Sequence, residues 1–383
     1  MIRKEYYQDL TKMNTFGMKV KARCFIEYDS VADLVDIEFE ELARPVLHIG
    51  GGSNLLFTQD FNGTVLHSKI NFIEVLGECQ CVPEAPSQAS LRPSPYPGVG
   101  KCLFHTNGTS PSEADFPVFV SVGAGVVFDD FCAWAAKEGL WGVENLSHIP
   151  GEVGAAAVQN IGAYGVEAKD VISRVYCYDT VEEEFVHFDV AECGYGYRDS
   201  IFKNPEIKGR YIVTHVVFAL SREPQPRLEY GHLREAVSEA ASGNEPTPEQ
   251  IRRTIIKIRK EKLPEPSVMG SAGSFFKNPV IMMEHFCNIE AAAKAEHGAD
   301  CKVPHYDLPD GMVKVPAAWL IEQCGWKGRR SGGAAVYDRQ PLVIVNYTGE
   351  AYPEEIIGLE KRIIASVNAK FGIELHPEVE HIR

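Results

Sequence analysis

The chain has 383 residues, of which 45% are hydrophobic, and its formal net charge at pH 7 is −15. This size and composition predict a folded globular protein of two or three domains. The acidic charge argues against general nucleic-acid binding, which requires a basic face, so any anionic substrate must be held by a local cluster of Lys and Arg. No segment approaches the ~20 uncharged residues of a membrane span, and we therefore expect a soluble, cytosolic protein without membrane contact.

Ten cysteines are scattered through the chain without a CxxC pair, and we expect them to be reduced. Cys79, Cys81 and Cys102, together with His105, are of metal-ligating types. Their spacing fits no familiar zinc module, so we expect surface thiols there and no metal site.

Short strands separated by turns are expected at 45–49 and 64–67, as in an α+β unit. Between them lies the glycine patch Gly50-Gly51-Gly52-Ser53-Asn54. A Rossmann fingerprint would need a helix directly after its glycines. The following residues instead predict a strand, a turn at Asn62-Gly63 and another strand, which disfavours that fingerprint.

Five prolines lie between Pro83 and Pro97, mixed with Ser and Ala. Such a segment has too little apolar surface to pack, so we expect a flexible surface insertion over residues 82–117 with no role in chemistry.

Helical spacing of apolar residues predicts helices at 128–136, 247–262, 316–324 and 353–371. Gly139 suits the end of the first helix, and Pro248 suits the first turn of the second. In the last helix the residues expected to face inward are Ile356, Ile357, Ile363, Ile364 and Val367.

The stretch from Ile149 to Gly165 is rich in glycine and alanine. Gly151, Gly154, Gly162 and Gly165 can adopt positive φ, so that consecutive amide N–H groups could point at an anion. One such patch alone is as consistent with an ordinary tight turn as with a nucleotide site. Two long patches, together with the shorter patch 122–125, favour a dinucleotide or its phosphates.

Three further segments carry polar groups that could act in chemistry. Ser274 follows a tight turn within Gly270–Pro279, where a rigid hydroxyl could donate a proton or simply cap the turn. Arg198 lies with Asp199 and Lys203 between aromatic residues. Its guanidinium could bind a carboxylate or an enolate, or form a solvated ion pair. Glu378 begins an alternating tail of strand type, and nothing in that pattern alone separates it from a solvated charge.

Taken together and in this order, these motifs resemble the UDP-N-acetylenolpyruvoylglucosamine reductases, also called UDP-N-acetylmuramate dehydrogenases, which are flavoenzymes of bacterial peptidoglycan precursor synthesis. The resemblance runs from Asn14 to Glu378 apart from the proline-rich insertion, and includes Tyr197-Arg198-Asp199-Ser200 and Gly332-Gly333-Ala334-Ala335. The segment Pro224–Gly231 is similar to the mobile tyrosine loop of the longer subgroup of this family.

The resemblance implies an α+β fold of the vanillyl-alcohol oxidase type, in which two α+β subdomains bind FAD non-covalently and a C-terminal α+β domain binds the substrate. The corresponding bounds are 1–68, completed by 373–383, then 69–263 and 264–372. It also implies NADPH as the hydride donor, and we expect a monomer.

The resemblance further implies roles for particular residues. Ser274 is similar to the general acid of the family, and Arg198 and Glu378 to the pair that polarises the enolpyruvyl group. Tyr230, Lys262 and Asn278 match residues that hold the diphosphate and uridine part of the substrate, and Gln323 is a further candidate contact. Cofactor contacts are implied for Gly50, Gly51, Gly52, Ser53, Asn54, Gly123, Ala124, Gly151, Val153, Gly154, Ala155, Gln159, Asn160 and Tyr164.

The chemistry accounts for these residue types. Hydride addition to the enolpyruvyl ether builds negative charge beside its carboxylate, and a guanidinium at that place stabilises it. A carboxyl group there must be protonated or serve to position the guanidinium. A fixed serine hydroxyl then delivers the proton, and fixed geometry offsets much of its weak acidity. We expect Ser274, Arg198 and Glu378 to converge beside the reactive flavin nitrogen.

Two features depart from the family pattern: Glu380 stands where Arg is usual, and the insertion has no counterpart. Two other functions stay open. One is a flavin oxidase of the same fold that acts on a sugar or alcohol, and the other is a silent nucleotide-sugar binding protein.

Overall fold

The computed structural model describes residues 1–78 and 117–383. The expectations for the proline-rich insertion, and for Cys79, Cys81, Cys102 and His105, lie outside the described residues. The chain divides into two compact units. The first unit comprises residues 1–27, 38–67 and 257–383, and the second comprises residues 28–37 and 68–256.

The first unit begins with a four-stranded sheet in the order β1-β2-β5-β3, in which β3 and β5 are parallel. A separate parallel pair joins β4 to β20, so the tail of the chain completes structure formed by the N-terminal residues. These strands are β1 (Ile2–Asp9), β2 (Lys21–Tyr28), β3 (Val46–Ile49), β4 (Leu55–Phe57), β5 (Phe61–Ser68) and β20 (Glu380–Ile382).

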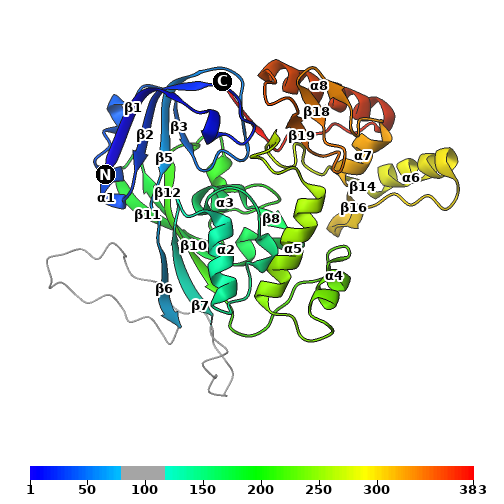
Figure 1. Cartoon of the computed structure of the whole chain (residues 1–383), viewed down its shortest axis with the longest axis horizontal. Helices are drawn as coiled ribbons and strands as arrows, with labels where there is room; N and C mark the ends of the chain where they lie inside the picture. The colour runs from blue at the N-terminus through cyan, green and yellow to red at the C-terminus, as the bar shows by residue number, and fades with distance from the viewer. Residues whose placement is uncertain (79–116) are drawn as a thin grey trace. The chain divides into compact units, whose positions relative to one another are not determined.

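The rest of the first unit contains two small antiparallel sheets and three helices (Figure 1). The strands are β13 (Gly270–Ser271), β14 (Val280–Met282), β15 (Tyr306–Asp307), β16 (Met312–Lys314), β17 (Arg330–Ser331), β18 (Ala334–Val336) and β19 (Ile344–Asn346). The helices are α6 (Met283–His297), α7 (Ala317–Gln323) and α8 (Pro353–Phe371).

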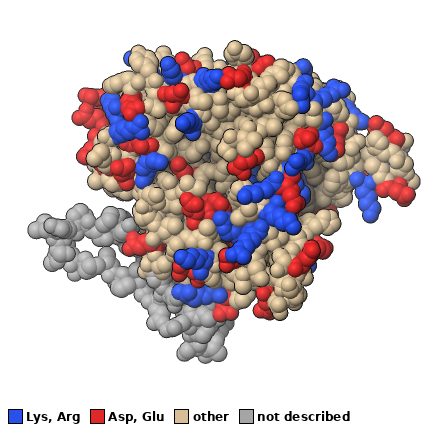
Figure 2. Space-filling view, viewed as in Figure 1, with Lys and Arg blue, Asp and Glu red and all other residues tan. Residues whose placement is uncertain are grey.

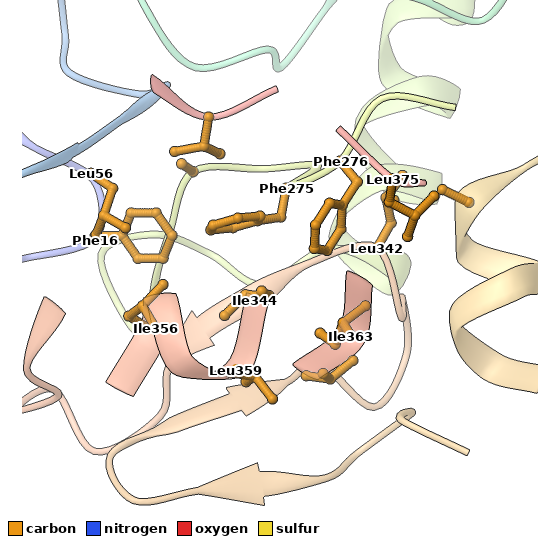
Figure 3. Close-up of a cluster of buried hydrophobic side chains, with 14 of the residues drawn as sticks. Phe16, Leu56, Phe275, Phe276, Leu342, Ile344, Ile356, Leu359, Ile363 and Leu375 are labelled. Atoms are coloured by element: carbon orange, nitrogen blue, oxygen red, sulfur yellow. The ribbon is translucent and has the colours of Figure 1, made fainter. Parts of the chain in front are cut away.

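A single hydrophobic core joins the N-terminal and C-terminal parts of the first unit. Phe16, Leu56 and Phe275 belong to the same buried cluster as Leu359 and Ile363 of α8, and Figure 3 shows these side chains together. Removing this apolar surface from water stabilises the unit by roughly 25 cal/mol per Å². The shared core fixes the loop around residue 275 relative to α8.

The second unit is built on a five-stranded antiparallel sheet in the order β11-β10-β12-β7-β6, with α2 and α3 packed against it (Figure 1). Its strands are β6 (Ile73–Glu78), β7 (Val118–Gly123), β8 (Gly162–Ala163), β9 (Val166–Glu167), β10 (Ile172–Asp179), β11 (Glu184–Asp189) and β12 (Tyr211–Leu220). Its helices are α1 (Val31–Val35), α2 (Phe128–Lys137), α3 (Val153–Gln159), α4 (Leu233–Ala240) and the start of α5 (Pro248–Lys262).

Six short 3-10 helices connect these elements in the described residues. They are η1 (Thr11–Met13), η2 (Phe39–Glu41), η4 (Glu144–Leu146), η5 (Ala168–Asp170), η6 (Ile201–Lys203) and η7 (Pro309–Gly311).

The helices predicted from periodicity are confirmed as α2, α5, α7 and α8. Gly139 follows α2 with a φ of 71°, in keeping with the predicted helix end. In α8, Ile356, Ile363 and Val367 are buried as expected, whereas Ile357 and Ile364 are only partly buried. None of the helices within residues 1–78 and 117–383 carries an apolar stretch long enough to cross a bilayer.

Two local predictions are wrong. Asn62 and Gly63 lie inside β5 rather than in a turn. A Cβ at residue 63 would lie 2.0 Å from the Pro45 carbonyl oxygen, so this glycine permits a close approach of two chains. Gly154 and Gly162 do not adopt positive φ, because α3 and β8 include them, whereas Gly151 and Gly165 do, with φ of 122° and 79°.

Candidate active site

The glycine patch 50–54 forms the loop between β3 and β4 in the first unit. Gly52 has a φ of 62°, and a Cβ there would lie 1.9 Å from the Met13 carbonyl oxygen, so no larger residue fits. Among the described residues, no hydrogen bond uses the backbone N–H of Gly51 or of Gly52. These two N–H donors and the absence of side chains fit the diphosphate of a nucleotide cofactor.

The shorter patch 122–125, at the end of β7, and the stretch from Ile149 to Gly165 both lie in the second unit. A Cβ at Gly123 would lie 2.4 Å from the Ile70 carbonyl oxygen, and one at Gly154 would lie 2.9 Å from the Ala124 Cβ. The N–H of Gly154 donates to the Ala124 carbonyl at 2.9 Å, which fixes the start of α3 against the end of β7. Gly151, Val153 and Ala155 belong to the turn before α3 and to that helix. The bond from Gly154 brings them to the end of β7, from which α2 separates them in sequence.

Asn160 ends α3 in the left-handed conformation, with a φ of 43°, and is fully buried. Its Nδ2 donates to the Gly196 carbonyl at 2.8 Å and to Glu167 Oε2 at 3.1 Å, while its Oδ1 accepts from the Lys169 N–H at 3.0 Å. The side chain is therefore committed to protein contacts. The predicted cofactor contact of Asn160 would therefore be made by its backbone atoms, and it stays a prediction.

Arg198 is held against the same segment. Its guanidinium donates to the Gly162 carbonyl at 2.8 Å and approaches the Asn160 carbonyl at 3.5 Å. Lys203 bridges the Arg198 carbonyl, at 2.8 Å, and Gln159 Oε1, at 3.1 Å. The backbone at Arg198 has a φ of 55°, an uncommon conformation for a non-glycine residue that this network holds in place.

No thiol nucleophile accompanies Arg198 in this segment. Cys193 is buried, and burial raises the pKa of its thiol to about 11. The thiol therefore stays protonated near neutral pH, which excludes it as a nucleophile there.

Tyr164 and Tyr230 lie together in the second unit. Their ring centroids are 5.8 Å apart with an interplanar angle of 80°, an edge-to-face arrangement. Asn145, which is fully buried, donates through Nδ2 to the Tyr164 carbonyl at 2.9 Å and to the Arg227 carbonyl at 2.7 Å. One side chain thus ties the predicted tyrosine segment to the predicted cofactor segment.

Ser274 and Glu378 come together in the first unit. The N–H of Glu378 donates to the carbonyl of Phe275, the neighbour of Ser274, at 2.8 Å. Next to this bond, Phe276 and Pro377 form an isolated antiparallel β-bridge. The carbonyl of Glu378 accepts from Asn54 Nδ2 at 3.1 Å. The predicted general acid, the predicted carboxyl group and the glycine patch 50–54 are therefore adjacent.

Asn278 and Gln323 lie at opposite ends of α7. Asn278 Oδ1 accepts from the N–H of Ala317, the first residue of that helix, at 2.9 Å. Gln323 ends the helix and lines an open hollow of about 190 Å³ with Trp319 and Lys370. Because a helix rises about 1.5 Å per residue, Ala317, to which Asn278 is bonded, and Gln323 are about 9 Å apart along its axis. Both remain predicted contacts of one extended ligand.

Lys262 is the last residue of α5 and is exposed. This helix carries Arg252, Arg253, Lys257, Arg259, Lys260 and Lys262, and Figure 2 shows a band of basic side chains along it. A chain with a net charge of −15 thus has the local basic cluster that an anionic substrate requires.

The sequence patterns did not single out Asn145 as a functional residue. A lone Asn before an apolar residue carries no local signal, and its role depends on contacts with segments far along the chain. Lys203 was noted only as a neighbour of Arg198, yet it joins the carbonyl of that residue to the end of α3.

The sequence is similar to family models and to reductases of known name. A family model described as UDP-N-acetylenolpyruvoylglucosamine reductase, C-terminal domain, matches residues 265–382, and one described as FAD binding domain matches residues 117–187. A UDP-N-acetylenolpyruvoylglucosamine reductase of Bacteroides fragilis is 46% identical over 379 residues, which cover 99% of this chain and 100% of that protein. The corresponding protein of Neisseria meningitidis serogroup B is 41% identical, over 97% of this chain and 96% of its own.

The fold is also similar to that of a solved reductase structure. A crystal structure of UDP-N-acetylenolpyruvylglucosamine reductase from Thermus caldophilus matches with a TM-score of 0.62 at 20% identity, covering 100% of this chain and 99% of that chain. The predicted α+β fold, with an FAD-binding part of the vanillyl-alcohol oxidase type and a C-terminal reductase domain, is confirmed. With close relatives matched over its whole length and both family models in the expected order, this chain belongs to the UDP-N-acetylenolpyruvoylglucosamine reductase family.

Proposed function

We propose that this chain is an NADPH-dependent FAD enzyme that reduces the enolpyruvyl ether of UDP-N-acetylglucosamine-enolpyruvate to UDP-N-acetylmuramate in peptidoglycan precursor synthesis. The observation that carries the proposal is the full-length similarity to reductases of that name, at 46% identity. The backbone pairing that brings Glu378 beside the Ser274 loop supports it from the structure.

FAD, when bound, supplies the hydride that NADPH has delivered to it. The donors that fit its diphosphate are the N–H groups of Gly51 and Gly52, in a loop where a Cβ at residue 52 would clash with the backbone. The proposed contacts for the remainder of the cofactor are Gly123, Ala124, Gly151, Val153, Gly154, Ala155, Gln159, Asn160 and Tyr164.

Arg198 is the residue that stabilises negative charge on the enolpyruvyl carboxylate. Its guanidinium is held at 2.8 Å from the Gly162 carbonyl, so it needs little reorganisation when charge develops on the substrate. Ser274 delivers the proton to the substrate carbon next to that carboxylate. Glu378 polarises the enolpyruvyl group together with Arg198, either as the protonated acid or by positioning the guanidinium.

Tyr230, Lys262 and Asn278 bind the diphosphate and uridine part of the substrate, with Gln323 as a further contact. We also propose that the segment 224–231 is the tyrosine loop of the longer subgroup, that the protein is a cytoplasmic monomer, and that its domains are 1–68 with 373–383, 69–263 and 264–372. Asn145 supports the tyrosine-loop assignment, because it fixes the base of that segment beside Tyr164.

The test follows the visible spectrum of the purified protein without oxygen. NADPH should bleach the yellow colour, and enolpyruvyl-UDP-N-acetylglucosamine should then restore it. A reduced protein that only oxygen reoxidises would indicate an oxidase of the same fold. A colourless protein that cannot be reconstituted with FAD would indicate a silent nucleotide-sugar binding protein.

A further inference from the structure

A histidine–carboxylate contact lies next to the Ser274 loop and has no part in the proposed chemistry. His381 Nε2 on β20 is 3.2 Å from Glu360 Oε2 on α8. The Glu360 side chain is 7% exposed and that of His381 is 24% exposed. Glu360 lies on the face of α8 that otherwise carries Leu359 and Ile363 of the hydrophobic core.

Placing two ionisable groups in an apolar environment is costly, and well-packed apolar residues of similar volume are often as stable or more stable. Stability alone is therefore a weak reason for this pair. What such a contact provides is a restraint on position. Neither Glu360 Oε2 nor His381 Nε2 has a hydrogen-bond partner among the described residues, so their proximity to each other favours one placement of β20 against α8.

The strand that carries His381 has few other restraints. β20 is three residues long and pairs with β4 alone, through a parallel register that sets His381 opposite Leu56. Its ends are fastened by the Glu380 N–H to the Asn54 carbonyl at 3.0 Å and by Thr58 Oγ1 to the Ile382 carbonyl at 3.0 Å. The pair with Glu360 is a side-chain contact that fixes the strand to α8.

His381 is also close to the loop that bears the predicted general acid. Its ring centroid is 6.2 Å from that of Phe275, whose carbonyl accepts the N–H of Glu378 at 2.8 Å. Movement of His381 would therefore displace Phe275, and the hydrogen bond between the Phe275 carbonyl and the Glu378 N–H would pass this displacement to Glu378.

We propose that Glu360 and His381 are positioning residues, which act through β20 and Phe275 to hold Glu378 beside Ser274. The proposal rests on the proposed function, because Glu378 and Ser274 have their roles only in the reduction of the enolpyruvyl group. A residue on the buried face of α8, Glu360, would then affect the rate of the reaction without being a predicted ligand contact.

The experiment measures the two half-reactions separately in the flavin-bound protein. Glu360→Gln keeps the size of the side chain and removes its charge. We expect it to leave flavin reduction by NADPH within about twofold and to slow reoxidation by the enolpyruvyl substrate about tenfold, equivalent to about 1.4 kcal/mol in the barrier. His381→Gln should give the same split, and it serves as the second variant if Glu360→Gln folds poorly.

Combining the change with Glu378→Gln shows whether the effect passes through Glu378. We expect Glu360→Gln to slow reoxidation by less than about twofold in that background, because residues that act as one unit are not additive. Glu290→Gln is the matched control. Its carboxylate pairs with Lys294 at 2.9 Å on α6 of the same unit, so both half-reactions should stay as in the parent protein.

Equal slowing of both half-reactions with a lowered Tm would reduce the pair to a structural role. Full additivity with Glu378→Gln, or an unchanged rate of reoxidation, would overturn the proposal. If the parent protein itself is not reoxidised by the enolpyruvyl substrate, it is the proposed function that fails.

Discussion

Arg198 and the Ser274–Glu378 pair are held in different ways in the two units of the chain. Arg198 is fixed by side chains that reach backbone carbonyls within residues 159–203. Glu378 is joined to Phe275, the neighbour of Ser274, by a backbone hydrogen bond between segments that are distant in sequence, and the Asn54 side chain adds one further bond to its carbonyl. Backbone pairs do not depend on side-chain identity, whereas a side-chain network loses a contact with each substitution. The second unit should therefore be the more sensitive to replacement of the residues around its catalytic group.

Loss of the hydroxyl at residue 274 should have the largest effect. Ser274→Ala leaves the backbone pairing of Phe275 with Glu378 in place and removes only the proton donor. We expect reoxidation by the enolpyruvyl substrate to slow by about 10²–10⁴-fold, the usual contribution of general acid catalysis, with flavin reduction by NADPH nearly unchanged. Stopped-flow absorbance of the flavin checks both steps. Ser366→Ala, on the exposed face of α8, is the control, and equal slowing of both half-reactions would remove Ser274 from the role of proton donor.

A conservative change at Arg198 tests the other unit. Arg198→Lys keeps the charge but loses the planar fork that reaches the Gly162 carbonyl. We expect the turnover of the enolpyruvyl substrate to fall by about 10²-fold, close to the loss of one preorganised donor to developing charge. Steady-state kcat and KM measure it. Arg3→Lys is the reference that should keep both constants, because Arg3 is an exposed residue of β1 paired with Glu5. A fall in affinity with kcat unchanged would mean that Arg198 binds the ground state only.

Asn160 is the residue at which we expect the second unit to be most sensitive to a single replacement. Replacement with Ala leaves the Gly196 carbonyl and the Lys169 N–H without their partner and places Ala in the left-handed region. We expect the free energy of unfolding to fall by about 3 kcal/mol. Urea denaturation checks this value. Asn244→Ala, which removes one bond of 3.3 Å to the Ala241 carbonyl, should cost much less; similar losses in the two variants would contradict the idea that Asn160 organises the second unit.

The last prediction concerns pH, where the effect of one residue is spread over several pH units. Burial lowers the pKa of His215 to about 4, and its ring stacks on Tyr176 at a centroid distance of 4.3 Å. Between pH 6.5 and about 4 the unfolded chain binds a proton at this residue that the folded chain does not. The free energy of unfolding should therefore decrease as pH falls through this range, with a contribution of up to about 1.4 kcal/mol per pH unit. His215→Phe should flatten that slope in denaturation curves, whereas His232→Phe at an exposed position should leave it; an unaltered slope in the first variant would show that His215 is already protonated when folded.

Features with a local cause could be predicted from the sequence. The helices α2, α5, α7 and α8 follow from apolar spacing and from Gly or Pro at their ends, since these forces act within one turn. α6 was missed because Phe286, Ile289 and Ala293 give it only a narrow apolar face. α3 was missed because glycine and alanine were interpreted as open backbone, whereas the close approach of Gly154 to Ala124 stabilises a short helix.

The candidate site was predictable mainly through resemblance to a family. Nothing local to Glu378 distinguishes it from a solvated charge, because its neighbours in space come from Asn54 and Phe275. Asn145 and Glu360 gave no signal for the same reason. Contacts that span hundreds of residues depend on the whole fold, and a single sequence does not specify them residue by residue.

Asn145 also bears on how the chain can be recombined with its relatives. Its amide donates to both the Tyr164 carbonyl and the Arg227 carbonyl, so the two segments share one anchor. A chimaera that takes the tyrosine segment from one parent and the residue 164 turn from another would have to satisfy the same amide with backbones of different origin. Crossover points outside residues 145 to 230 keep both hydrogen bonds of Asn145 within the sequence of one parent. Crossover points inside this range can remove one of the two bonds.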